Sequence, residues 1–378
     1  MGSNQKPPSS SSVKLAYVDA LRGIAVLLVI LVHTGGRTPQ GLHFMSLSVY
    51  GQYGVQLFFV LSAFTLCHSL EKITVLTKED YLGFMTKRFF RIAPLYYLGI
   101  VFYFLFTYLA LNLVHYTPFT APSNYSAIGV LSNVLFLHGL VPEGNTNIVP
   151  GGWSIGCEFL FYAVFPFLFV KARAHRWVLL FSAIIAGLIT LTLQIVTSKI
   201  QGFDVGLNTF TYFSVSNQFP CFILGMIYYF YQNQEKIRRL FLILFVPSLI
   251  AIWLLHTTVW GWCLLPLAAG VASVGTALLI ERKPIPALLQ KIGQLSFSMY
   301  LWHFIVVWTV SPIFKAKLPH SDLFSILQFF IIIALTYVMA EISNRLIENP
   351  GIALGHRMAN RLRKNRNIGH VNQSVSNP

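Results

Sequence analysis

The sequence predicts an all-α polytopic membrane protein with about ten transmembrane helices, and two observations carry that prediction. Hydrophobic residues make up 55% of the 378 residues, whereas charged residues make up only 10%, and mean hydropathy is +0.63. Apolar runs of near-spanning length, about 20 residues each, recur along the whole chain. We therefore expect a membrane-embedded bundle and no soluble domain.

Ten spans are predicted, with both termini on the cytoplasmic side. The spans cover residues 17–34, 53–70, 94–114, 153–170, 177–197, 211–231, 240–256, 259–280, 294–311 and 323–347. The apolar segment 127–141 is too short to cross a bilayer, so we predict an interfacial or re-entrant piece of the third outside loop. If this segment crossed the membrane, Glu158 and everything after it would change sides.

The net charge of +15 follows from this topology. Of the 27 lysines and arginines, 21 fall on inside segments and 4 on outside loops, while Arg22 and Arg345 lie within spans. Such an excess is the positive-inside pattern, so the basic charge indicates membrane lipids and not nucleic acid as partners. The four cysteines have no metal or redox spacing, and we predict no metal site.

Three regions are expected along the chain. Residues 1–13 form a polar leader that we expect to be disordered, and residues 14–350 form the membrane domain. Residues 351–378 form a basic cytoplasmic tail, which we expect to lie on anionic lipid as an amphipathic or disordered end.

Arg22 and His33 share the apolar segment YVDALRGIAVLLVILVHTGG (17–36). In a helix, eleven residues bring the two side chains to within about 20° of the same face and about 16 Å apart along the axis. Ionisable residues within a span usually face a protein interior or cavity. Asp19 could form a local ion pair with Arg22. A structural pair plus an interfacial histidine is the alternative.

The segment KRFFRIAPLYY (87–97) places Arg88 and Arg91 at the predicted cytoplasmic start of the third span. Pro94 then falls near the start of a helix, where proline is tolerated. One interpretation is a topology signal with aromatic anchors. The other is a phosphate site, because guanidinium groups match phosphate oxygens in bidentate geometry.

The segment GGWSIGCEFLFYAVFP (151–166) places Ser154, Glu158 and Tyr162 on one helix face at four-residue steps. Glu158 has no cation nearby in sequence and is predicted in the outer half of its helix, at a depth close to that of His33. Such a carboxylate should be protonated or find a partner in another helix.

The segment SFSMYLWHF (296–304) carries His303, which is predicted near mid-membrane. A core histidine with a satisfied hydrogen bond is an equally good interpretation. The predicted depths form a series from the inner to the outer side: Arg88 and Arg91, then Arg22, then His303, then His33 and Glu158. A cytoplasmic donor with phosphates at one end and a thioester at the other could extend along this series, and acyl-CoA is such a donor.

These residues also carry a family resemblance. The chain resembles the acyltransferase-3 family of integral membrane acyltransferases, which includes bacterial O-antigen and exopolysaccharide O-acetylases. The similar segments are YVDALRGIAVLLVILVH (17–33), FFVLSAF (58–64), KRFFRIAPLYY (87–97), WSIGCEFLFYAVFP (153–166), SFSMYLWH (296–303) and IENP (347–350). One departure is Ser62-Ala63-Phe64, where the family usually has S-G-F.

The resemblance implies about ten helices in a bacterial inner membrane. It also implies transfer of an acyl group, usually acetyl from acetyl-CoA, to a hydroxyl of a lipid-linked or surface glycan. Acetyl-CoA would be a donor substrate, and no permanently bound cofactor is implied. The resemblance marks Arg22 and His33 as essential. The family's arginines before the third span correspond here to Arg88 and Arg91, and its W-S-x-x-x-E element falls on Ser154 and Glu158.

We therefore hypothesise that Arg22, Arg88 and Arg91 bind the diphosphate and adenosine-phosphate end of acyl-CoA at the cytoplasmic side. His33 would act as general base or carry the acyl group transiently, and Glu158 would orient or stabilise its imidazole. The supporting residues would be Asp19, Ser154, Tyr162 and His303.

Two alternatives to glycan acylation stay open. The first is a transporter or glycolipid flippase in which buried Arg, His and Glu residues form a relay. The second is an acyltransferase that acts on a macrolide or another small hydroxylated molecule.

Overall fold

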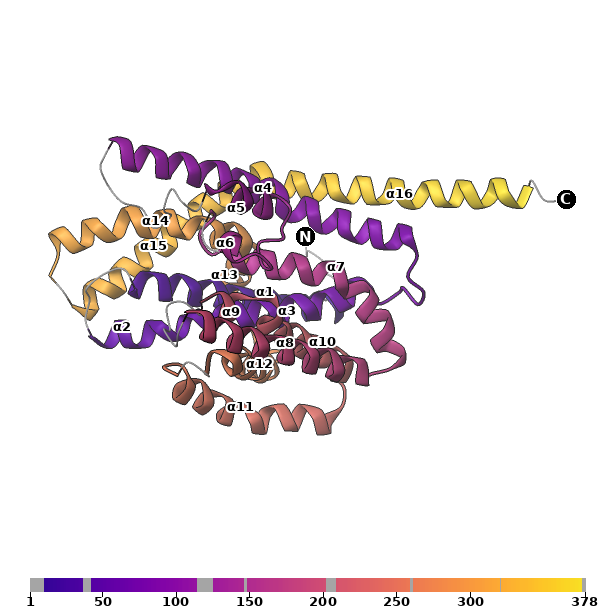
Figure 1. Ribbon diagram of the computed structural model, residues 1–378, viewed down its shortest axis with the longest axis horizontal. Helices are drawn as coiled ribbons and strands as arrows, with labels where there is room; N and C mark the ends of the chain where they lie inside the picture. Colours follow the sequence, from indigo (N-terminus) through magenta and orange to yellow (C-terminus); the bar gives the residue numbers. More distant parts are fainter. Residues whose placement is uncertain are drawn as a thin grey trace, which may run out of the picture. The chain divides into compact units, whose positions relative to one another are not determined.

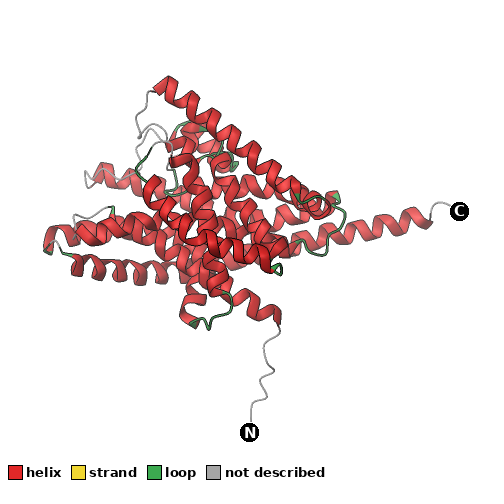
Figure 2. Cartoon of the chain, turned by 90° about the horizontal axis from the view of Figure 1, so that it is seen from below, coloured by secondary structure: helices red, strands yellow, loops and turns green. Residues whose placement is uncertain are grey.

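The computed structural model describes residues 10–36, 42–113, 125–145, 148–201, 209–258, 261–319 and 321–375, which form helices joined by turns and loops (Figures 1 and 2). The helices of the first half are α1 Ser10–Gly35, α2 Leu42–Ser48, η1 Val49–Tyr53, α3 Gly54–Ser69, α4 Lys78–Leu113, α5 Ala127–Val134, α6 Pro142–Asn145, α7 Trp153–Ala174 and α8 Trp177–Gln201. Those of the second half are α9 Thr209–Phe213, α10 Val215–Tyr231, α11 Glu235–Leu255, α12 Gly261–Ile280, α13 Ala287–Gln294, α14 Ser296–Lys317, α15 Asp322–Ser343, η4 Asn344–Glu348 and α16 Asn349–Val375.

The predicted all-α polytopic architecture is confirmed. Within the described residues, nine helical segments are long and apolar enough to cross a membrane. They are Ala16–Gly35, His43–Ser69, Lys78–Leu113, Trp153–Ala174, Trp177–Thr197, Glu235–Leu255, Gly261–Ile280, Ser296–Lys317 and Asp322–Leu362, and each overlaps a predicted span. The remaining predicted span, 211–231, contains α10, whose 17 residues are at the short end of the spanning range.

The chain divides into two compact units. The first consists of Met1–Thr65 and Pro220–Tyr337, and the second of Leu66–Phe219 and Val338–Pro378. In the first unit α1 packs against α13 and α14. A Cβ atom at Gly293 would lie 1.6 Å from the carbonyl oxygen of Asp19, and one at Gly23 would lie 2.5 Å from that of Leu289. The backbones of α1 and α13 are therefore in direct contact, which only small residues allow.

In the second unit α4 lies alongside α16 (Figure 1). The prediction that Pro94 falls near the start of a helix is wrong, because α4 begins at Lys78 and contains Pro94 in its interior. A proline cannot donate to the carbonyl four residues earlier, here that of Phe90. Gly351 of α16 lies against this carbonyl, since a Cβ at 351 would be 2.6 Å from Phe90 O and 3.1 Å from Pro94 Cγ. The Asn349-Pro350-Gly351 segment thus fits α16 to the proline of α4.

The sequence also makes predictions for the short apolar segment 127–141 and for the two ends of the chain. Helix α5 has eight residues, too few to cross a bilayer. Of the predicted leader, residues 1–9 lie outside the described residues, whereas Ser10 to Val13 already belong to α1. The basic tail is helical as far as Val375, as part of α16.

The contact at Gly293 generates a stability prediction. Gly293→Ala should lower the apparent melting temperature of the protein in detergent and cost about 1–3 kcal/mol, because the new methyl group overlaps the Asp19 carbonyl. Gly187→Ala is the matched control, because a Cβ there meets nothing within 4 Å. Within a helix that change should leave stability equal or higher. Equal melting temperatures for the two variants would show that α1 and α13 do not depend on this contact.

Candidate functional site

The first unit brings two histidines together. The rings of His33 on α1 and His303 on α14 have centroids 5.2 Å apart, and Phe304 lies 4.3 Å from His33 and 4.1 Å from His303. His303 is fully buried, while His33 is only partly buried. Nδ1 of His303 lies 2.6 Å from the carbonyl oxygen of Tyr300. This nitrogen must therefore carry the proton, which leaves Nε2 of a neutral His303 as an acceptor.

The sequence-based depth series separated these histidines, and the structure corrects it. Gly293 is next to last in α13 and touches Asp19, so α14 begins three residues after a contact with α1. His303 then lies seven residues into α14, about 10 Å along that helix, and His33 lies fourteen residues beyond Asp19, about 21 Å along α1. The ring contact between them shows that the two helices and their side chains span the remaining distance. His303 therefore belongs beside His33 and not at a separate level below it.

Arg22 and Asp19 form hydrogen bonds with different helices. Nη2 of Arg22 donates to Thr65 Oγ1 at 3.2 Å, and Oδ2 of Asp19 accepts from Gln294 Nε2 at 3.3 Å. Thr65 in turn donates to the carbonyl oxygens of its own helix, so its lone pairs face the guanidinium. These hydrogen bonds hold Arg22 in place three turns of α1 before His33.

The second unit gathers Glu158, Tyr162 and the two predicted arginines. The Tyr162 hydroxyl donates to Glu158 Oε1 at 2.5 Å, which confirms that these two residues share a face of α7. The guanidinium of Arg88 on α4 lies 5.9 Å from the centre of the Tyr162 ring and 5.4 Å from that of Phe84. Arg88 and Arg91 are both close enough to Tyr162 to act on it electrostatically. The Ser154 hydroxyl instead donates a hydrogen bond to the carbonyl oxygen of Gly151, three residues earlier, at 3.1 Å.

The predicted depth separation between Arg88 and Glu158 is therefore wrong. Tyr162 contacts both Glu158 and Arg88. Helix α4 has 36 residues and a length of about 54 Å, more than the thickness of the hydrocarbon core, so its arginines need not lie at a membrane boundary. The sequence pattern placed the helix start at Pro94 and so assigned the arginines to a boundary. In the structure they lie ten and thirteen residues into a continuous helix that contacts α7.

Sequence reasoning missed a buried polar network in the second unit. The Tyr96 hydroxyl donates to Asn133 Oδ1 at 2.6 Å, and His138 Nε2 lies 2.8 Å from the carbonyl oxygen of Gly152, the residue before α7. A Cβ at Gly156 would lie 2.6 Å from His138 Nε2. The signal was present, because Asn133 and His138 are polar residues in an otherwise apolar run.

The glycines of GGWSIG have separate structural reasons in this network. Gly151 has φ 74°, a left-handed conformation that favours glycine. Gly152 must accommodate Tyr96, whose hydroxyl would lie 2.8 Å from a Cβ, and Gly156 must accommodate the His138 ring. Together they fix the start of the helix that carries Glu158.

Two kinds of chemistry are available in these arrangements. The first unit offers a paired imidazole site and a guanidinium on one helix. The second offers a carboxylate held by a phenol, close to two cations. Among the described residues, no group of three or more His, Cys, Asp or Glu side chains could hold a metal ion.

Comparison with known proteins supports an acyl-transfer chemistry. The acyltransferase domain of the acyltransferase 3 family matches residues 15–341. O-acetyltransferase OatA of Staphylococcus aureus is 26% identical over 372 residues, covering 89% of this chain and 57% of the relative. Peptidoglycan O-acetyltransferase OatA of Listeria monocytogenes is 25% identical over 376 residues, covering 88% and 55%.

A shorter match is acyltransferase MdmB of Streptomyces mycarofaciens, 27% identical over 173 residues, which covers 43% of this chain and 41% of the relative. The chain spans a little over half the length of the two O-acetyltransferases. No solved structure matches.

The burial of His138 generates a pH prediction. Burial lowers the pKa of His138 below its usual value. As pH falls below about 6.5, the unfolded chain therefore takes up a proton before the folded chain does, and stability is lost. His138→Gln keeps a donor for Gly152 and should reduce the fall in melting temperature between pH 7.5 and 5, a contribution on the order of 1 kcal/mol.

The exposed His175 provides the control, because His175→Gln should leave the wild-type pH dependence unchanged. Thermal unfolding followed by fluorescence at several pH values measures all three proteins. A His138→Gln profile as steep as the wild-type profile would contradict the prediction.

Proposed function

The chain belongs to the acyltransferase 3 family, and from this membership we propose that it is a membrane-embedded O-acyltransferase. It moves an acyl group, acetyl in the simplest case, from cytoplasmic acyl-CoA to a hydroxyl of an extracytoplasmic glycan, in a bacterial inner membrane. The observation that carries the proposal is the contact between His33 and His303, with Arg22 on the same helix as His33. The names of the relatives support an acetyl group, and that of the Listeria protein adds peptidoglycan to O-antigen and exopolysaccharide as acceptor classes.

His33 acts as the general base in this proposal. Its imidazole takes the proton of the acceptor hydroxyl as the oxygen attacks the thioester carbonyl. The carbon–sulfur bond breaks, and the thiolate of CoA leaves and receives that proton. A group whose free pKa is near neutrality suits both proton transfers. A transient acyl-imidazole is a second route with the same balance, since the acyl group then passes from His33 to the hydroxyl.

His303 is the positioning residue for this step. Its Nδ1–H group is bound by the Tyr300 carbonyl, so Nε2 keeps its lone pair. Within the described residues this Nε2 atom is buried and has no hydrogen-bond partner. A buried acceptor of this kind favours a hydroxyl as its partner, because leaving it unsatisfied costs about 1–3 kcal/mol. A second hydroxyl of the acceptor glycan would supply that hydrogen bond, so that the attacking hydroxyl keeps its one proton for His33.

The charged residues take the donor and supporting roles. Arg22, Arg88 and Arg91 are proposed to bind phosphate groups of acyl-CoA, for which guanidinium geometry is well suited. Glu158, held by Tyr162, would stabilise positive charge that develops on a histidine during transfer. Asp19 and Ser154 support the two helices through their bonds to Gln294 and Gly151.

A transporter or glycolipid flippase is the rival function, since buried Arg, His and Glu residues also form relays. The two functions differ in covalent chemistry. Membranes incubated with acetyl-CoA labelled in the acetyl group would transfer label to glycan under the proposed function. Movement of glycolipid without label in the glycan would favour the rival. Mass spectrometry of surface glycans from strains with and without the gene would identify the acceptor.

The role of His33 gives a direct prediction. His33→Ala should reduce acetyl transfer in membrane vesicles by about 100-fold or more, the usual contribution of a general base. Labelled acetate in the glycan product is the readout. His175→Ala, which removes an exposed histidine outside the site, should leave transfer unchanged. Wild-type transfer by His33→Ala at normal expression would eliminate both the base and the acyl-carrier role.

Arg88 gives a prediction about donor binding. Arg88→Ala should raise KM for acetyl-CoA at least about 10-fold, because it removes a charged hydrogen bond worth about 1.5–3 kcal/mol. The value of kcat should change less, since the phosphates do not react. Lys171→Ala removes an exposed cation at the end of α7 and should leave KM unchanged. An unaltered KM for Arg88→Ala would exclude this residue from the donor site.

A further inference from the structure

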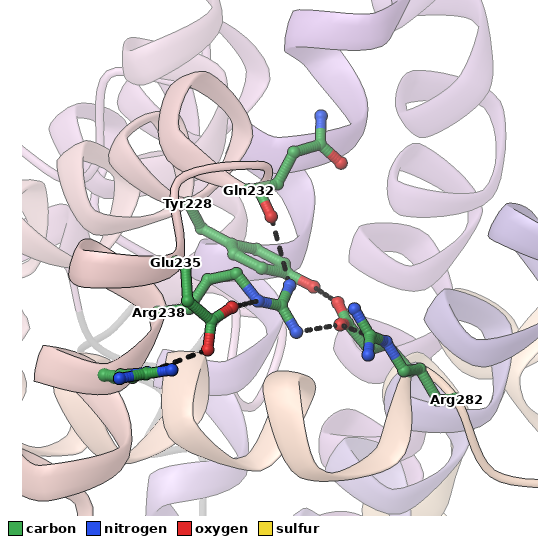
Figure 3. Close-up of polar contacts among 7 residues, drawn as sticks. Tyr228, Gln232, Glu235, Arg238 and Arg282 are labelled. Atoms are coloured by element: carbon green, nitrogen blue, oxygen red, sulfur yellow. Dashed lines mark hydrogen bonds and ion pairs between the residues drawn. The ribbon is translucent and has the colours of Figure 1, made fainter.

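A polar cavity of about 340 Å³ is lined by residues of the first unit, and Figure 3 shows the polar contacts around Arg238 in its wall. The cavity lies where α1 begins, α10 ends, α11 begins and α12 ends. We call it the Arg238 cavity. Its wall is formed by Tyr17 of α1, by Gln232 and Asn233 in the turn after α10, and by Arg238 of α11, with Glu235, Glu281 and Arg282 at the helix ends.

A chain of hydrogen bonds makes the cavity wall rigid. Arg238 Nη2 donates to Glu281 Oε1 at 2.6 Å, and the Tyr228 hydroxyl donates to Glu281 Oε2 at 2.7 Å. The Tyr228 hydroxyl also lies 3.1 Å from that of Tyr17. The side chains of Arg238 and Glu281 are only 14% and 13% exposed, so they neutralise each other as part of the wall. Four helices are thereby tied around the opening.

Other polar side chains of the lining lie beside this hydrogen-bonded wall. Arg238 binds the main-chain carbonyl of Gln232, and Figure 3 shows the side-chain amide of Gln232 turned away from the guanidinium. Asn233 is exposed in the same turn. The side chain of Arg282 is 81% exposed, although its Nε lies 3.7 Å from Glu281. The residues that line the cavity thus include two with amide side chains and one with an exposed guanidinium.

The charge around the opening favours an anion. Five cations occur in the two segments that form it, against two carboxylates. The cations are Lys236, Arg238, Arg239, Arg282 and Lys283, and the carboxylates are Glu235 and Glu281. Such an excess of positive charge at helix ends marks the cytoplasmic side of a membrane protein. The ligand would therefore come from the cytoplasm.

Helix α1 connects this cavity to the proposed acyl-transfer residues. Tyr17 of the wall precedes Arg22 by five residues, which is about 7.5 Å along the axis and about 140° around it, and Arg22 precedes His33 by about 16 Å on nearly the same face. By level along the helix axis the order is a polar cavity, a guanidinium and a histidine, so a donor that follows this order passes around α1 between Tyr17 and Arg22. The order of groups along acyl-CoA is a purine nucleotide, a diphosphate, a long apolar arm and a thioester.

We propose that the Arg238 cavity binds the 3′-phosphoadenosine end of acyl-CoA, an inference that rests on the proposed function. The amides of Gln232 and Asn233 pair with the edge of the adenine ring, as such amides do in nucleic-acid recognition. Arg282 binds the 3′-phosphate. A cavity of about 340 Å³ accommodates a nucleotide, since small-ligand sites begin at about 300 Å³. A lipid phosphate is less well matched, because a headgroup has no base edge for two amides.

The first experiment measures binding of adenosine 3′,5′-bisphosphate to the full chain in detergent or nanodiscs. This probe carries the nucleotide without the arm or thioester. Saturable binding to the wild type is expected, with Kd raised about 10-fold by Arg282→Ala and also raised by Gln232→Leu. Lys283→Ala removes the neighbouring exposed cation outside the cavity lining and should change Kd less than 2-fold. Equal effects of Arg282→Ala and Lys283→Ala would overturn the proposal, since they indicate only general charge.

The second experiment compares acetyl-CoA with S-acetylpantetheine, a donor that lacks the nucleotide. Arg282→Ala should raise KM for acetyl-CoA about 10-fold and leave kcat/KM for S-acetylpantetheine unchanged. Equal loss with both donors would overturn the nucleotide assignment. Phosphatidylglycerol nanodiscs that abolish bisphosphate binding, where phosphatidylcholine nanodiscs do not, would assign the cavity to a lipid phosphate instead.

These results separate the cavity from the proposed function. Arg282-dependent bisphosphate binding without any acetyl transfer would retain the nucleotide site and reject the acyltransferase. Transfer from acetyl-CoA without bisphosphate binding would retain the acyltransferase function and reject the nucleotide site. Because Arg282 is 81% exposed, its alanine variant should fold normally, and an unchanged melting temperature checks this.

Discussion

Polar side chains within apolar helices must find partners inside the protein, because lipid offers none, and this constraint organises both units. Arg22 bonds Thr65, His303 bonds the carbonyl of Tyr300, and Glu158 accepts from Tyr162. Each partner also removes a rotational choice from the charged or aromatic group. The satisfied polar bonds therefore orient the groups that the chemistry needs, in addition to making their burial affordable.

Close backbone contacts set the positions from which these side chains extend. Gly293 lies on the Asp19 carbonyl, so α13 ends and α14 begins close to a defined level of α1, and His303 lies beside His33. In the second unit Gly152 and Gly156 admit Tyr96 and His138 in the same way. Packing this close is possible because these glycines have no Cβ atom. A methyl group at these positions would force the neighbouring helices or side chains to shift.

The sequence predicted much of this arrangement, and its errors have a common cause. Hydropathy located the spans, and four-residue spacing correctly paired Glu158 with Tyr162. Depth along a span was inferred from where apolar runs begin, which misplaced Arg88 because α4 starts sixteen residues before Pro94. It likewise separated His303 from His33. Contacts between helices depend on how the helices pack in three dimensions, and the hydropathy pattern of one sequence does not specify that packing.

A single helix can serve as a ruler for a long substrate. Each residue of α1 adds about 1.5 Å along the axis, so the axial distances from Tyr17 to Arg22 and on to His33 are fixed by residue count and by the stiffness of the helix, with Tyr17 about 140° around the helix from Arg22. A flexible loop would lose conformational entropy each time the donor bound. The bonds of Tyr17, Arg22 and Asp19 to neighbouring helices hold that ruler in place. Under the proposed function, binding free energy from the remote, unreactive end of the donor would then position its thioester at His33.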